Sequence, residues 1–266
     1  MTDELLAPQS VSPEPPPVPK PWGAWATIGL GLAVALMFIA AQTLALVGFL
    51  LVKLSQGPIP DLMDYVQSLA TNGLVVSIAT LASAVVGIGF IYLFVRVRGF
   101  KRIGDYIGLK RISWKTLLAT VGIFILTLAA TLLLEYIVAR FAGSSAESRN
   151  TSFMTDTYNT AGWLPLFWLA VAGFAPVFEE AFFRGFLFVG LERSRLGVAG
   201  TIVFTSLVWA LLHIQYNWAG MAEILMMGFV LGALRYRTRS LWSTIIFHSA
   251  WNFAALVSVA LAVRGS

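Results

Sequence analysis

The sequence contains no cysteine and few charged residues, and both shortages narrow the class of protein. With no cysteine among 266 residues, disulfide scaffolds, thiolate nucleophiles and cysteine-ligated zinc sites are excluded. Charged residues make up only 12% of the chain, against about 25% in soluble domains, while 58% of the residues are hydrophobic. This balance indicates a protein that crosses a membrane several times.

The fold class follows from seven long apolar runs. About 20 apolar residues cross the roughly 30 Å of hydrocarbon as a helix, and helices satisfy their own backbone groups there. We expect an all-α, polytopic membrane bundle of about seven transmembrane helices, with an overlong fourth run that is kinked or split at Pro176. The runs lie near residues 22–52, 74–95, 115–139, 163–192, 197–214, 218–234 and 241–263.

The chain is expected to have three parts. Residues 1–20 are rich in proline, acidic and poor in apolar side chains, which is typical of a disordered tail. Residues 21–140 hold the first three membrane helices and a basic inner loop, without a motif that could support chemistry. Residues 160–264 hold the remaining helices and the polar motifs, so this part is the expected functional core.

The positions of Lys and Arg predict how the chain lies in the membrane. With the N-terminus inside, thirteen of the 18 basic residues fall on the inner side, and basic loops stay cytoplasmic. We expect a multi-pass plasma-membrane protein with a cytoplasmic N-terminus, whose basic segment 96–115 lies on anionic lipid head groups rather than on nucleic acid. The thirteen residues are Lys20, Arg96, Arg98, Lys101, Arg102, Lys110, Arg111, Lys115, Arg193, Arg195, Arg235, Arg237 and Arg239.

Three charged side chains interrupt the fourth apolar run, in the stretch FAPVFEEAFFRGFLF. A charge at mid-membrane costs about 3 kcal/mol on insertion scales, so such groups need partners or a function. Glu180 and Arg184 are spaced i, i+4 and can neutralise each other, which makes both supporting residues. Glu179 points about 100° away and needs a partner on another helix.

The only two histidines of the chain are expected at the depth of Glu179. Counted from the turn between the fourth and fifth runs, Glu179 lies about 20 Å along its helix and His213 about 24 Å along the returning one. His248 and Asn252 share one face of the last run, and a modest tilt brings them into the same layer. A buried ion cluster that merely fixes helix packing is the alternative, but it leaves the second carboxylate unexplained.

This group of side chains suits hydrolysis by an activated water. Glu179 with an imidazole can act as general base, while the other histidine and Asn252 can donate hydrogen bonds to an oxyanion. Glu179, His213 and His248 are also a ligand set for catalytic zinc, so the sequence leaves zinc open. The spans contain no HExxH motif, no aspartate and no G-x-S-x-G elbow, which leaves water as the nucleophile and Glu179 as its activator.

These motifs resemble those of the CPBP or Abi family, the CAAX prenyl endopeptidases and bacteriocin-processing proteins. EEAFFRG matches the family motif EExxxR, HSAWN matches HxxxN, and WALLH matches FxxxH with Trp209 in place of phenylalanine. The resemblance covers roughly residues 160–260. It implies an intramembrane endopeptidase that cleaves a peptide or protein substrate near a membrane-proximal or C-terminal segment, with or without a prenyl group.

The resemblance also implies a role for each matched residue. Glu179 and His213 would activate the water, and His248 and Asn252 would hold the oxyanion. Zinc-dependent and metal-free mechanisms are both argued for the family, so possible zinc binding stays open. Two other functions remain: a non-catalytic scaffold or bacteriocin-immunity protein, in which Glu179→Gln is harmless, and a proton-coupled transporter that would include Glu223 in its relay. The sequence shows no inverted repeat to support the transporter.

Overall fold

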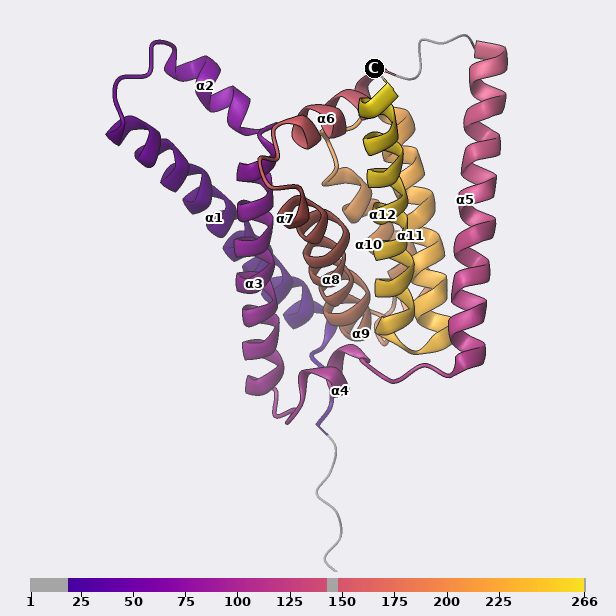
Figure 1. Ribbon diagram of the computed structural model, residues 1–266. Coiled ribbons are helices and arrows are strands. Elements are labelled where there is room, and N and C mark those ends of the chain that lie inside the picture. Colours follow the sequence, from indigo (N-terminus) through magenta and orange to yellow (C-terminus); the bar gives the residue numbers. More distant parts are fainter. Residues whose placement is uncertain (1–18, 143–147, 266) are drawn as a thin grey trace, which may run out of the picture.

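The computed structural model describes residues 19–142 and 148–265, and all regular elements among them are helical (Figure 1). The all-α prediction is confirmed for this part of the chain, whereas the expected disordered tail lies almost entirely outside it. In chain order the elements are α1 (Ala24–Ser55), α2 (Leu62–Leu69), α3 (Gly73–Val97), α4 (Ile103–Ile107), α5 (Trp114–Ala142), α6 (Ser148–Asn159), α7 (Leu164–Leu169), η2 (Ala170–Phe174), α8 (Ala175–Glu180), η3 (Ala181–Leu187), α9 (Phe188–Leu191), α10 (Gly197–Leu211), α11 (Trp218–Thr238) and α12 (Leu241–Gly265).

Six of the described helices are long and apolar enough to cross a membrane. They are α1, α3, α5, the continuous helix from α7 to α9, α11 and α12. The fifth predicted span ends early, because α10 stops at Leu211 and has 15 residues, fewer than the roughly 20 that a full crossing needs. The protein is thus a multi-pass membrane bundle of six to seven spans, as predicted.

The overlong fourth span is one continuous helical path, distorted rather than broken. The π-helical segments η2 and η3 flank α8. Pro176 lies in the first turn of α8, directly after η2. Because proline donates no backbone hydrogen bond and crowds the preceding turn, a change of hydrogen-bonding pattern next to it is a common adjustment. The predicted split at Pro176 therefore takes the form of a π-helical segment.

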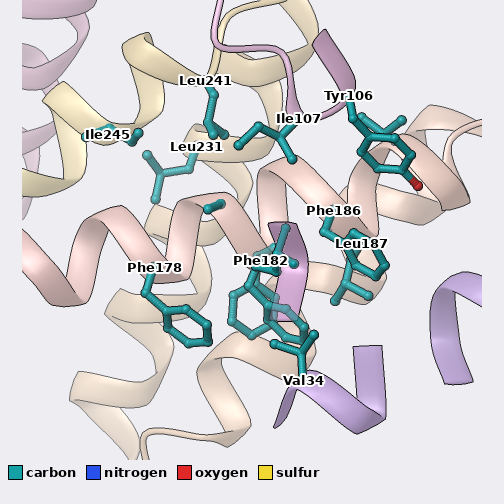
Figure 2. Close-up of a cluster of buried hydrophobic side chains, with 14 of the residues drawn as sticks. Val34, Tyr106, Ile107, Phe178, Phe182, Phe186, Leu187, Leu231, Leu241 and Ile245 are labelled. Atoms are coloured by element: carbon teal, nitrogen blue, oxygen red, sulfur yellow. The ribbon is translucent and has the colours of Figure 1, made fainter. Parts of the chain in front are cut away.

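The helix α7–α9 is the centre of the bundle (Figure 1). It contacts α1 and α3 on one side and α10, α11 and α12 on another, and α4 packs on η3. Every residue of η3 is buried. Phe178 of α8 and Phe182 and Phe186 of η3 are spaced four residues apart and belong to one buried cluster with Val34 of α1 (Figure 2). Aromatic packing therefore holds the charged part of this helix in place.

The motif GFVLG brings α11 close to α10. A Cβ atom added to Gly228 would lie 2.7 Å from Cβ of Ser206, and one added to Gly232 would lie 2.8 Å from Cγ2 of Ile202. Small residues four apart let membrane helices approach closely. The glycines thus fix α11 against the helix that carries Trp209, one of the residues described below.

A buried arginine connects the segment at α4 to the central helix. Arg235 of α11 donates through Nε to the carbonyl of Arg184 (2.9 Å) and through Nη2 to the carbonyl of Ile107 (3.3 Å). Gly108 follows with φ +80°, and a Cβ atom there would lie 2.5 Å from Nη2 of Arg235. Only glycine adopts this backbone without strain and leaves room for the guanidinium.

We expect Gly108→Ala to destabilise the protein. The left-handed backbone alone costs about 1–2 kcal/mol with a Cβ atom, and displacement of Arg235 adds to it. A thermal-unfolding midpoint in detergent, followed by tryptophan fluorescence, measures the loss. Gly122→Ala is the matched control, because nothing lies within 4 Å of its added Cβ; an equal shift in both variants would contradict the explanation.

Candidate active site

A cavity of about 570 Å³ lies between the central helix and α5, α10, α11 and α12. All four residues predicted to be catalytic line it, namely Glu179, His213, His248 and Asn252. Glu179 comes from α8, His213 from the loop after α10, and His248 and Asn252 from α12. The four side chains therefore line one cavity, whereas their catalytic roles stay a prediction.

The two supporting residues lie behind this cavity as a fully buried ion pair. Nη1 of Arg184 is 3.0 Å from Oε1 of Glu180, and neither side chain is exposed. Nη2 of Arg184 donates to the carbonyl of Gly228 at 3.3 Å. The i, i+4 pairing predicted from the sequence thus exists, and the cation is anchored to α11 as well.

His248 binds the glutamate that the sequence had paired only with arginine. Its Nδ1 lies 2.9 Å from Oε1 of Glu180. Because a carboxylate can only accept, Nδ1 carries the proton and Nε2 is the nitrogen left for a ligand. The sequence had left His248 open as a partner of Glu179. In the structure Nδ1 of His248 binds Glu180 instead, because Glu180 faces α12.

Glu179 instead accepts a hydrogen bond from an indole. Nε1 of Trp209 lies 2.5 Å from Oε2 of Glu179. Trp209 precedes His213 by one helical turn and carries a longer side chain. Its indole N–H therefore reaches the carboxylate of Glu179, which the histidine rings do not. Sequence reasoning treated Trp209 as one aromatic in place of another and missed its donor, although the N–H of tryptophan was the available signal.

His213 lies just beyond the C-terminal end of α10, with its ring held on both sides. Its Nδ1 is 2.8 Å from the carbonyl of Trp209; since a carbonyl only accepts, Nδ1 is protonated and Nε2 keeps its lone pair. Tyr216 stacks on the ring at 6.1 Å between centroids. Burial raises the pKa of Tyr216, in the loop before α11, to about 12, so its hydroxyl stays protonated at neutral pH.

Two more features complete the cavity. Asn252 donates through Nδ2 to the carbonyl of Val171 in η2 at 2.9 Å, which uses one of its two amide hydrogens. Glu223, whose position the sequence left open between the polar layer and the outer interface, lines the cavity together with Tyr216. Neither Tyr216 nor Glu223 belongs to a motif, so only their positions in space connect them with the site.

The cavity residues do not fit the alternative zinc site. Among the residues that the structure describes, no three His, Cys, Asp or Glu side chains are grouped to hold a metal ion. One carboxylate oxygen of Glu179 is bound by Trp209. These side chains form a hydrogen-bonded set rather than a cluster of ligands around one point.

Residues 161–254 match the family model described as type II CAAX prenyl endopeptidase Rce1-like. This segment is an Rce1-like domain. It runs from just before α7 into α12 and includes all six residues singled out by the motifs. Membership of the domain in this family implies an intramembrane protease with peptide substrates. No curated protein and no solved structure gives a significant match to the chain.

Proposed function

We propose that the chain is an intramembrane endopeptidase that hydrolyses a peptide bond near a membrane-proximal or C-terminal segment of its substrate. Glu179 and His213 activate the water, and His248 and Asn252 hold the oxyanion. The observation that carries the proposal is the convergence of these four side chains on one cavity, where an indole orients the carboxylate.

The geometry of Glu179 suits a general base. Trp209 binds Oε2, so we assign Oε1 to the attacking water. His213, with Nδ1 protonated by its bond to a carbonyl, offers Nε2 as a second acceptor that orients the water. The water oxygen attacks the scissile carbonyl carbon while its proton passes to Glu179, which then protonates the leaving amine.

His248 and Asn252 are placed to stabilise the oxyanion. Glu180 binds Nδ1 of His248, as a buried carboxylate binds the histidine of a catalytic triad, and this leaves Nε2 for the substrate. When the ring is protonated, Nε2 donates to the oxyanion. The second amide hydrogen of Asn252 supplies another donor, and such preorganised donors act strongly where water is excluded.

The walls of the cavity indicate the kind of substrate. Towards α5 and the last turns of α12 the lining is apolar, with Leu128, Leu132, Ala255, Leu261 and Ala262 among the contributors. An apolar segment of a peptide or protein substrate at the membrane fits such walls. We therefore propose cleavage of a quenched peptide library, prenylated and unprenylated, in proteoliposomes as the test. If neither the wild type nor Glu179→Gln cleaves any peptide, the scaffold or immunity function is favoured instead; cleavage that survives Glu179→Gln contradicts the role of Glu179 as the base.

The orientation proposed for the chain can be tested because it has no cysteine. Single cysteines can be introduced by Arg111→Cys and Asp64→Cys. Position 111 follows α4 at one end of the bundle, and position 64 lies in α2 at the other end (Figure 1). Since basic loops stay cytoplasmic, we expect a membrane-impermeant maleimide to label Asp64→Cys in intact spheroplasts, and Arg111→Cys only after permeabilisation. The reverse labelling pattern would overturn the proposed cytoplasmic position of the N-terminus. Labelling confined to another membrane would overturn the proposed location in the plasma membrane.

A further inference from the structure

We infer that Trp209 is a positioning residue that sets the orientation of Glu179 through a hydrogen bond that phenylalanine could not make. The inference rests on the proposed role of Glu179 as the base. Trp209 stands where the FxxxH pattern has phenylalanine. Its indole N–H is a hydrogen-bond donor that a phenylalanine side chain lacks.

Trp209 contacts both groups that are proposed to activate the water. Its Nε1 donates to Oε2 of Glu179 at 2.5 Å, and its backbone carbonyl accepts from Nδ1 of His213 at 2.8 Å. The side chain is 1% exposed, so water does not compete for the indole N–H. One residue therefore aligns the carboxylate and fixes the tautomer of the imidazole.

The indole ring is itself held by the charged core. Cζ of Arg184 lies 4.5 Å from its centroid, a cation–π distance. The rings of His213 and His248 meet it edge-on, with centroids 5.4 Å and 5.2 Å away. With these neighbours the indole cannot turn without breaking several contacts, so the donor is aimed at Glu179 before substrate arrives.

The bond has a direct consequence for Glu179. It occupies Oε2 of the carboxylate, which leaves Oε1 for the water. Phenylalanine at this position keeps the packing and the face for Arg184 but provides no donor. The other titratable groups around the site are Glu180 and Arg184 from the central helix, His213 and Tyr216 from the loop after α10, Glu223 from α11 and His248 from α12.

Trp209→Phe tests the inference by kinetics. A hydrogen bond to a charged group is worth a factor of roughly 10 to 100, so we expect kcat to fall by that factor with little change in KM. Trp22→Phe is the matched control, because Nε1 of Trp22 also donates to a partly buried acceptor, the carbonyl of Phe94, but lies outside the cavity; its kcat should stay that of the wild type.

A second measurement tests the contact without relying on cleavage. In a 15N-labelled sample in detergent, the indole resonance that disappears in Trp209→Phe belongs to Trp209. We expect it to shift with pH in the wild type and to lose that shift in Glu179→Gln. A resonance that titrates equally in both overturns the inference.

The two measurements separate this inference from the proposed function. If Glu179→Gln is inactive while Trp209→Phe keeps the kcat of the wild type, only the role of Trp209 is wrong. If Glu179→Gln cleaves as well as the wild type, the proposed function is wrong, and the indole resonance still decides whether Trp209 holds the carboxylate.

Discussion

Glu179→Gln is expected to lower kcat for peptide cleavage by roughly 10²–10⁴-fold, the usual contribution of a general base. The amide has the shape of the carboxylate and can still accept from Nε1 of Trp209, but it cannot take a proton from water. Because Glu179 is not part of the buried ion pair, the protein should keep its fold. KM should change little, since the carboxylate acts on the water rather than on the substrate.

A glutamate outside the cavity provides the control for this change. Glu192 follows the same central helix and pairs with Arg239 at 3.2 Å, away from the cavity. Glu192→Gln should leave kcat within about twofold, as surface changes usually do little. Initial rates with the best library peptide, for protein matched by thermal midpoint, make the comparison. If Glu179→Gln retains most of the wild-type rate, Glu179 is not the base.

Glu180→Gln is expected to destabilise the protein, by about 3–5 kcal/mol. Removal of this charge leaves Arg184 fully buried without its counter-ion. The same substitution replaces the carboxylate that binds Nδ1 of His248 by a neutral amide. We therefore expect kcat to fall as well. Thermal unfolding in detergent, combined with initial rates below the unfolding range, measures both effects.

A double substitution separates these two effects. Glu180→Gln with Arg184→Met removes both buried charges and should recover much of the lost stability, because replacing a whole buried pair is often neutral. Cleavage should stay low, since His248 still lacks its carboxylate. Glu192→Gln is again the control: it breaks a pair whose arginine is 55% exposed, and such pairs are worth less than about 1 kcal/mol. Full recovery of cleavage in the double variant would contradict the role given to Glu180.

The two adjacent glutamates therefore perform different tasks. Glu180 is enclosed by Arg184 and His248 and holds the charged core together, whereas Glu179 faces the cavity with one oxygen bound by Trp209. Their separation by about 100° around the helix places one carboxylate towards α12 and the other towards α10. Two neighbouring residues of one type thus acquire different surroundings.

The fold class followed from the sequence because apolar length determines which segments can cross a bilayer. The bounds of the central helix and of α10 agree with that pattern to within a few residues. The division into residues 21–140 and 160–264 stays a prediction. The helical segments α2, α4 and α6 were not anticipated, since short helices at the membrane surface carry little apolar signal.

The sequence by itself indicated four of the residues that line the cavity, Glu179, His213, His248 and Asn252, because ionisable groups inside an apolar run are costly and their spacing along each helix is known. It also determined the pair of Glu180 and Arg184, which lies within one helix. Which partner each remaining group binds was decided only by the tertiary structure. The contacts of Glu179 with Trp209 and of His248 with Glu180 depend on the rotation and depth of α10 and α12, which the packing of whole helices sets and no local spacing records.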